Sequence, residues 1–251
     1  MYDQYISLLS QTKAYPNFIT VEGMDGSGKS TQVDTIEREL RGCGLDMIRT
    51  REPGGTPLGE ALREMILNDD MDLETEVNLI LAARCEHLRK VILPALEAGK
   101  VVLCDRFEDS MFAYQVARGY PEEKLRIQGQ LVTGGVVPGT TLVFLVEPSV
   151  STQRMLSRGE KLDRFEADGE PLQAAVYRNY ERRIESAPSG GTRYIRIDAN
   201  RPLAVVTPEV RTIARSLGEQ LVASGYVLAD SPEEVSGLGE EPCAPRKRFG
   251  K

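Results

Sequence analysis

The sequence is poor in the residues that build disulfide and metal frameworks. It has no tryptophan, one histidine and only four cysteines among 251 residues, namely Cys43, Cys85, Cys104 and Cys243. These cysteines form no CxxC pair and no metal-ligand spacing, so we expect reduced thiols in a cytoplasmic protein. The longest apolar runs, such as LVFLV at 142–146, are far shorter than the ~20 residues that span a bilayer. The first residues lack the basic start and apolar run of a signal peptide.

The chain also lacks an excess of positive charge. Its 31 basic and 38 acidic residues give a net charge of -7, and 41% of its residues are hydrophobic. This balance is ordinary for a globular domain and excludes a nucleic-acid surface spread over the whole molecule. A local cationic cavity for a small anion remains compatible with it.

Short β-rich runs alternate with helical segments along most of the chain. The strands are predicted at 18–22, 46–50, 101–104, 141–146 and 193–197. Helical segments follow them, starting near Lys29, Pro57, Glu108, Ser149 and Pro208. A long helix from Leu73 to Ala98 is expected to end at Gly99. The alternation predicts an α/β fold with a parallel sheet covered on both faces. Residues 1–17 are read as an extension, 18–225 as the domain, and 226–251, with few large apolar residues, as a disordered tail.

A phosphate-binding loop directly follows the first predicted strand. The segment GMDGSGKST fits the pattern G-x-x-x-x-G-K-[ST] and opens a helix. Its glycines let backbone N–H groups turn toward phosphate oxygens, and the helix dipole adds positive charge. We expect Lys29 to reach the terminal phosphates of ATP and Ser30 to hold Mg²⁺. The predicted ATP-binding residues are Gly23, Gly26, Ser27, Gly28, Lys29, Ser30 and Thr31. ATPases, GTPases, transporters and kinases share this motif, so it identifies the nucleotide and not the reaction.

Charged residues follow the other strands, at the edge where ligands bind in such sheets. Arg51 and Pro53 follow the second strand, and Asp105 and Arg106 end the third. A polar stretch after the fourth strand carries Arg154, Arg158, Lys161 and Arg164. Each arginine also has a simpler interpretation, such as Arg51 pairing with Glu52 or capping a helix, and Arg164 pairing with a neighbouring carboxylate. Together they indicate a second phosphate group, since transfer between two anions needs cations to hold both.

Several motifs, in order, resemble the thymidylate kinase family. They are VEGMDGSGKSTQ, TREPGGTPLGEALR, LAAR, VILPALEAGKVVLCDRFEDSMFAYQ, LDRFE and IDA. The resemblance runs from about Phe18 to about Gly225 and implies a three-layer P-loop kinase fold with a five-stranded parallel sheet and a small lid at about 154–170. It also implies a homodimer and phosphorylation of a deoxynucleoside monophosphate by ATP with Mg²⁺.

The resemblance implies roles for individual residues. Asp25 matches a carboxylate near the acceptor sugar and the metal, and Asp105 matches one that assists Mg²⁺ together with Ser30. Arg51 and Arg106 match arginines that bind the acceptor phosphate. Tyr114 matches an aromatic that disfavours a 2′-hydroxyl, and Arg84 one that bonds the thymine edge. The implied substrate residues are Asp25, Arg51, Pro53, Ile80, Arg84, Arg106, Ser110, Met111, Tyr114 and Gln115.

The catalytic residues implied by the resemblance are Lys29, Arg106 and an arginine of the lid. The phosphate loop contains no arginine, so this chain resembles the members whose lid supplies it. Arg158 is the first choice and Arg154 the second. Arg84 is expected to face the acceptor, with a base carbonyl as its partner and not a buried protein carboxylate.

Two residues depart from the family pattern. Ile80 stands where a phenylalanine usually stacks on the base, and Met111 where a small polar residue usually bonds it. Losing a stacking ring costs about 1 kcal/mol, and losing a polar partner relaxes discrimination further. dTMP is therefore the leading acceptor, and a 5-substituted dUMP or another deoxynucleotide is the alternative.

Two other function classes stay open at this point. A binding module would keep the nucleotide fold without transfer chemistry, although the lid arginines favour an enzyme. A kinase for a nucleoside hydroxyl would need a carboxylate base, for which Asp25 or Glu108 would serve. The only histidine, His87, is interpreted as a packed or surface residue.

Overall fold

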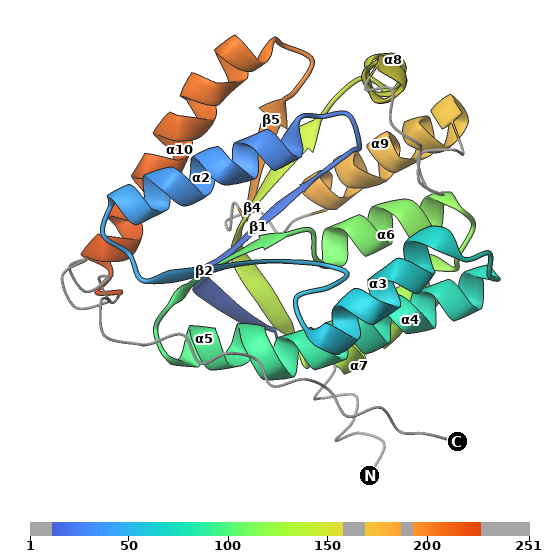
Figure 1. The fold of residues 1–251 in the computed structure, drawn as a ribbon, viewed down its shortest axis with the longest axis horizontal. Coiled ribbons are helices and arrows are strands. Elements are labelled where there is room, and N and C mark those ends of the chain that lie inside the picture. Colours follow the sequence, from blue (N-terminus) through green and yellow to red (C-terminus); the bar gives the residue numbers. More distant parts are fainter. Residues whose placement is uncertain (1–11, 158–168, 187–192, 227–251) are drawn as a thin grey trace, which may run out of the picture.

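Five parallel strands form one sheet, as the sequence predicts (Figure 1). The computed structural model describes residues 12–157, 169–186 and 193–226. The strand order is β2-β3-β1-β4-β5. The bounds are β1 Lys13–Gly23, β2 Met47–Arg51, β3 Val101–Asp105, β4 Val136–Leu145 and β5 Tyr194–Asp198. The predicted tail apart from Tyr226, most of the extension and most of the predicted lid lie outside the described residues.

The first strand begins earlier than the sequence pattern indicates. β1 starts at Lys13, which pairs with Val136 at the start of β4, and the register shifts between Tyr15 and Ile19. Pro16 lies at that irregularity, where a missing N–H is tolerated. Proline is usually depleted in strands, and the β-rich run that predicted this strand begins after it, at residue 18.

Helices connect the strands, and several differ from their predicted bounds. They are α2 Lys29–Gly42, α3 Pro57–Asn68, α4 Leu73–His87, the π-helical turn η1 Leu88–Ile92, α5 Leu93–Glu97, α6 Glu108–Ala117, α7 Glu122–Thr133, α8 Pro148–Ser157, α9 Gly169–Glu185 and α10 Leu203–Ala223. The predicted helix from Leu73 is one continuous helical run through η1. It ends at Glu97, two residues before Gly99, which has a φ of 77°. α10 starts before Pro208, which lies inside it.

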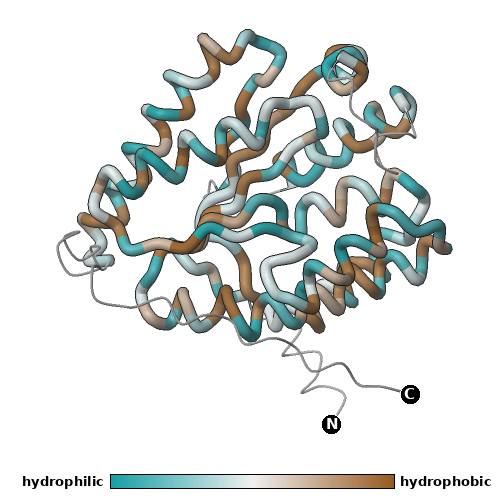
Figure 2. Tube along the Cα trace, viewed as in Figure 1, coloured by the Kyte–Doolittle hydropathy of each residue, from teal (hydrophilic) through white to brown (hydrophobic). Residues whose placement is uncertain are grey.

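The helices cover both faces of the sheet. α2 and α10 pack together over one face, and the run from η1 to α5, with α6 and α9, lies on the other (Figure 1). On α2, Val33, Ile36 and Leu40 repeat at helical spacing and are fully buried. Burying each such side chain stabilises the fold by about 1.5–3 kcal/mol. Figure 2 shows the hydrophobic residues gathered in the central strands.

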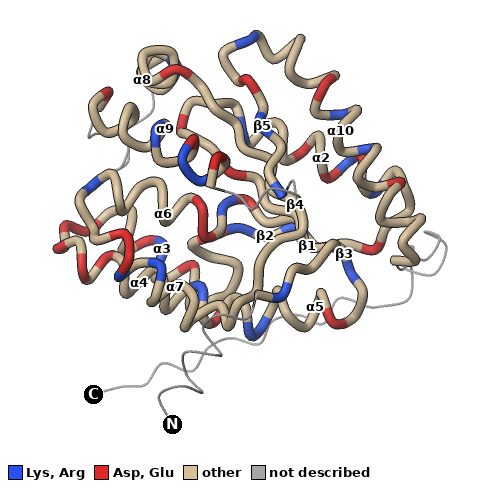
Figure 3. Tube along the Cα trace, turned by 180° about the vertical axis from the view of Figure 1, so that it is seen from behind, with Lys and Arg blue, Asp and Glu red and all other residues tan. Residues whose placement is uncertain are grey.

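Charged residues lie mainly on the helices and at the strand ends. Figure 3 shows lysines and arginines interspersed with acidic residues over the back of the molecule, without a uniformly basic face in that view. Among the described helices, none combines the length and the apolar character that crossing a membrane requires.

Candidate active site

The loop between β1 and α2 curls at the carboxyl edge of the sheet. Gly23, Gly26 and Gly28 have φ values of 143°, 73° and 78°, which side chains rarely adopt. A Cβ at Gly26 would lie 2.7 Å from the carbonyl oxygen of Ser151, so the backbone also approaches too closely for any other residue. The Ser27 Oγ is buried without a hydrogen-bond partner among the described residues. Burying an unpaired hydroxyl costs about 1–3 kcal/mol, which an anion in this loop would offset.

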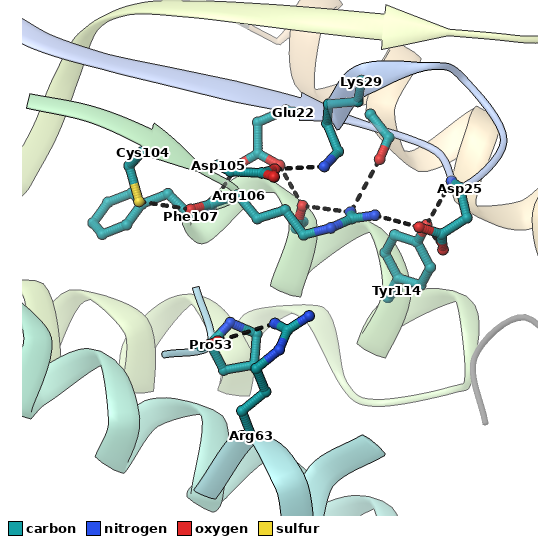
Figure 4. Close-up of polar contacts among 12 residues, drawn as sticks. Glu22, Asp25, Lys29, Pro53, Arg63, Cys104, Asp105, Arg106, Phe107 and Tyr114 are labelled. Carbon is teal, nitrogen blue, oxygen red and sulfur yellow. Dashed lines mark hydrogen bonds and ion pairs between the residues drawn. The ribbon is translucent and has the colours of Figure 1, made fainter. Parts of the chain in front are cut away.

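Lys29 and Asp105 form an ion pair across this edge (Figure 4). Burial, followed by the charge of Arg106, lowers the pKa of Lys29, although Asp105 counteracts part of this shift. Burial raises the pKa of Asp105, but Lys29 and Arg106 outweigh it and the net pKa is lower than usual. The two residues therefore contact each other at the edge of the sheet where the sequence pattern placed both.

Arg106 occupies the centre of the site in a left-handed backbone conformation. Its φ is 69°, the only positive value of a non-glycine residue in the part that the structure describes. Nη1 donates to the carbonyl of Gly23 and to Ser110 Oγ, both at 3.0 Å, and Nη2 donates to Asp25 Oδ1 at 2.5 Å. The Tyr114 hydroxyl donates to the other oxygen of Asp25 at 2.6 Å. Arg106, Asp25 and Tyr114 thus hold one another in place (Figure 4).

A buried carboxyl lies behind Arg106. Glu22 accepts hydrogen bonds from Phe107 N at 2.8 Å, from Ser110 Oγ and from the Tyr180 hydroxyl at 3.3 Å. Burial, with the nearby charge of Asp109, raises the pKa of Glu22 to about 7. Glu22 is not among the residues predicted for the site, although a glutamate inside an apolar strand was a usable signal.

A cavity beside Arg106 collects most of the predicted substrate residues. Nine of them line it: Asp25, Pro53, Ile80, Arg84, Arg106, Ser110, Met111, Tyr114 and Gln115. The other lining residues are not among those predicted for the site. These are Glu52, Arg63, Ile66, Leu67 and Phe107. The cavity lies between α3, α4 and α6, and Arg106 connects its lining to Gly23 and Asp25 of the phosphate loop.

The prediction that Arg84 has no buried protein carboxylate as its partner is wrong. Arg84 Nε donates to Glu52 Oε2 at 2.6 Å, and the two side chains are 1% and 3% exposed. Burial raises the pKa of Glu52, but Arg84 and His87 outweigh it and the net pKa is lowered. A buried guanidinium needs a nearby carboxylate, which the chain itself supplies from the turn after β2. Arg84 also lines the cavity, as predicted, and its Nη1 lies 3.4 Å from Met111 Sδ.

His87 is a packed residue, as the preferred interpretation held. It is fully buried, with Nδ1 3.0 Å from Glu52 Oε1 and Nε2 2.6 Å from Thr50 Oγ1. Glu52 therefore ties two residues of α4 to the end of β2, which orients the Arg84 guanidinium toward the cavity.

Arg51, which was predicted to bind the acceptor, does not line the cavity, and Arg63 lines it. Arg51 pairs with Glu60 at 2.7 Å, is about half exposed and does not line the cavity. Side chains alternate along a strand, so Arg51 points to the same face as Arg49, which pairs with residues of α2. Arg63 of α3 reaches the cavity instead, and donates to the carbonyl of Pro53 at 3.0 Å.

Arg63 has no carboxylate ion pair among the described residues. Burial, then the positive charges of Arg51 and Arg106, lowers its pKa. Figure 4 shows Arg63 reaching from α3 toward the space beneath Arg106. Two guanidinium groups thus approach one space from opposite sides, an arrangement that an anion between them would stabilise.

Gln115 contributes a polar group at another part of the cavity. Its Nε2 donates to Glu76 Oε1 at 3.0 Å, while its Oε1 is buried without a partner in the described structure. An unpaired buried oxygen of this kind is available to a ligand that carries a donor.

The predicted lid arginines are described only in part. Arg158, Lys161 and Arg164 lie outside the described residues. Arg154 donates to the carbonyls of Ala199 at 2.7 Å and Asn200 at 3.1 Å. These contacts satisfy N–H donors of the Arg154 guanidinium. Its catalytic role stays a prediction.

The carboxyl edge offers oxygen ligands for a hard cation. Asp25 lies in the phosphate loop, Asp105 pairs with Lys29 at the end of that loop, and Ser30 is exposed at the start of α2. No group of three or more His, Cys, Asp or Glu residues in the described part of the chain could hold a metal by itself. This set fits Mg²⁺, which typically binds one or two carboxylates and completes its shell with water and substrate phosphates.

Comparisons with known proteins agree with this geometry. The family model described as Thymidylate kinase matches residues 21–210. A thymidylate kinase of Pseudomonas putida (strain GB-1) is 44% identical over 207 residues, covering 81% of this chain and 97% of that protein. A thymidylate kinase of Methylobacillus flagellatus is 44% identical over 199 residues, covering 79% of this chain and 96% of that protein.

Proposed function

This chain belongs to the thymidylate kinase family, and on that basis we propose that it transfers the terminal phosphoryl group of ATP to dTMP, forming dTDP. The observation that carries the proposal is the pairing of two anion sites at one sheet edge. The phosphate loop with Lys29 forms one site, and the facing guanidinium groups of Arg63 and Arg106 form the other.

The chemistry requires charge neutralisation more than proton removal. A phosphate oxygen of dTMP is itself the nucleophile, so no general base is needed. Arg106 lies between the phosphate loop and the cavity, where it neutralises charge on the acceptor and on the group in transfer. Arg63 holds the acceptor phosphate from the other side, and Lys29 binds the donor phosphates.

We further propose Mg²⁺ as the cofactor. Asp105, Ser30 and Asp25 would hold it together with the phosphates. When bound, the ion neutralises phosphate charge and orients the donor. Asp105 is kept ionised at neutral pH, because Lys29 and Arg106 lower its pKa.

The rest of the cavity suits a thymine base. Arg84 offers a donor whose position is fixed by Glu52, and Gln115 offers an unpaired acceptor oxygen. Ile80 and Met111 add apolar surface. Thymine presents a carbonyl acceptor next to a ring N–H donor, which this pair complements. Tyr114, fixed by Asp25, stands where the family disfavours a 2′-hydroxyl.

A turnover panel tests the proposal. The wild-type protein is assayed for ADP formation with dTMP, dUMP, 5-hydroxymethyl-dUMP, dGMP and dCMP. We expect dTMP to have the highest kcat/KM, and Lys29→Ala or Arg106→Ala to abolish transfer. ATP binding without transfer to any acceptor would contradict the proposal and indicate a binding module. A higher kcat/KM for the 5-hydroxymethyl compound would overturn the choice of dTMP.

We also propose a cytoplasmic homodimer. Cys43, Cys85 and Cys104 are free thiols, which supports a reducing compartment. Ile127 and Leu131 of α7 are 39% and 59% exposed, and exposed neighbouring apolar side chains of this kind are typical of subunit contacts.

A further inference from the structure

Gln115 leaves one amide atom to the substrate cavity. The residue lines the cavity, but its Nε2 is turned away to Glu76, which lies outside the lining. The oxygen on the other branch of the amide is buried and has no partner in the described residues. The orientation of this amide decides whether a ligand in the cavity contacts a hydrogen-bond acceptor or a hydrogen-bond donor.

Glu76 determines that orientation. A carboxylate only accepts hydrogen bonds, so the NH₂ end of Gln115 must face Glu76 and the oxygen must face the cavity. The two ends of an amide have nearly the same size, and only a fixed neighbour distinguishes them. Glu76 is fully buried, and Arg118 Nη1 donates to its Oε2 at 2.6 Å. Arg118 thus provides the charge partner that a buried carboxylate requires.

The helix geometry places this pair beside the expected base site. Glu76, Ile80 and Arg84 recur at intervals of four residues, and so lie on one face of α4. Met111 and Gln115 have the same spacing on α6, which faces α4. Arg84 lies opposite Met111, with Nη1 3.4 Å from Sδ, and Glu76 lies opposite Gln115. Ile80 therefore lies between a donor at one end and an acceptor at the other.

We propose that Glu76 is a positioning residue that sets base specificity by acting through Gln115; this rests on the proposed function. Thymine presents a carbonyl and a ring N–H, which match the Arg84 donor and the Gln115 acceptor. Cytosine presents an amino group and an unprotonated ring nitrogen at the same places. The fixed Gln115 oxygen would face that nitrogen without a proton between them, which disfavours cytosine.

The Glu76→Gln variant tests this role. The introduced amide can accept from Gln115 or donate to it, so Gln115 is free to turn either end toward the cavity. We expect the ratio of kcat/KM for dTMP to that for dCMP to fall about tenfold, the equivalent of one hydrogen bond. Glu74→Gln is the matched control. Glu74 is on the same helix but pairs with Lys124 at the surface, and this variant is expected to keep the wild-type ratio.

A double-variant cycle separates positioning from a general loss of structure. Gln115→Met removes the amide at similar volume and should lower the ratio on its own. If Glu76 acts through Gln115, adding Glu76→Gln to Gln115→Met should lower the ratio no further. Glu76→Asp withdraws the carboxylate from Gln115 but keeps the negative charge beside Arg118. It should show the same fall, and replaces Glu76→Gln in the test if that variant does not fold.

The outcomes distinguish the inference from the proposed function. Equal losses of kcat/KM for dTMP and dCMP in Glu76→Gln, with the ratio unchanged, would overturn the inference alone. A further fall of the ratio in the double variant would also overturn it. A wild-type protein that does not phosphorylate dTMP would overturn the proposed function and the inference with it.

Discussion

Arg51 and Arg63 have similar chemistry and close positions in sequence, but different surroundings. Arg51 lies at the surface with Glu60, and Arg63 lies in the cavity lining without a carboxylate ion pair among the described residues. Arg51 lies at the surface because of the strand face that it occupies. Arg63 reaches the cavity because it extends from α3, which lines the cavity. The sequence pattern favoured Arg51, the arginine nearest the strand end, as the ligand of the acceptor phosphate.

Replacing these arginines separates their roles. Hydrogen bonds to charged groups contribute about 1.5–3 kcal/mol, so Arg63→Gln is expected to raise the KM for dTMP about 10- to 100-fold. The KM for ATP should change little, since Arg63 lies on the acceptor side. The matched variant Arg51→Gln should change the dTMP constant less than threefold or so, as an exposed ion pair contributes about 0–1 kcal/mol. Initial-rate kinetics measure both, and the reverse ranking would restore Arg51 as the phosphate ligand.

Arg84 also shows that sequence can place a residue in a site without identifying its partner. Its place in the cavity followed from the sequence, but its buried partner Glu52 did not. The two are 32 positions apart, and no local pattern relates them.

At the scale of elements, Glu22 connects β1 to the helices that form the site. It binds the Phe107 N–H and Ser110 at the start of α6, and the Tyr180 hydroxyl of α9. Ser110 in turn accepts from Arg106. The strand, the two helices and the central arginine are therefore held by one buried carboxyl.

The raised pKa of Glu22 makes stability depend on pH. Between its ordinary value of 4.5 and its folded value of about 7, the folded protein holds a proton that the unfolded chain releases. The free energy of unfolding therefore falls as pH rises through this window, by about 3 kcal/mol in total. Urea unfolding at about pH 5 and about pH 8 should show this fall in the wild type.

The Glu22→Gln variant should lose that part of the pH dependence, because an amide does not titrate. Glu219→Gln, at an exposed position of α10, is the control and should retain the wild-type profile. An identical profile in Glu22→Gln and wild type would assign the pH dependence to other groups.

At the scale of the whole molecule, α7 exposes the apolar side chains that the proposed dimer would cover. Sedimentation equilibrium should give twice the 27.8 kDa mass of one chain. Burial of a leucine contributes about 1.5–3 kcal/mol, so Leu131→Glu is expected to weaken the dimer at least about tenfold. Val205→Glu changes an exposed residue of α10 and should leave the mass unchanged. A monomeric wild type would refute the dimer.

Residues that are close together in sequence determined most of the fold and the phosphate-loop part of the site. Glycines with positive φ at Gly23, Gly26 and Gly28, a lysine and a helix start are adjacent in sequence, so the phosphate loop was predictable before folding. The period of apolar residues likewise predicted the five strands. These features depend on backbone sterics and local periodicity, which neighbouring residues specify.

Only the tertiary structure decided which charged and polar side chains contact one another. The pairs Arg84–Glu52 and Gln115–Glu76 join elements that are distant in sequence. The packing of α3 placed Arg63 and not Arg51 in the cavity lining. The strength of such contacts depends on burial in a common low-dielectric space and on helix and strand faces. Those conditions exist only after β2, α3, α4 and α6 have packed together, so sequence identifies the residue types and the packed fold chooses their partners.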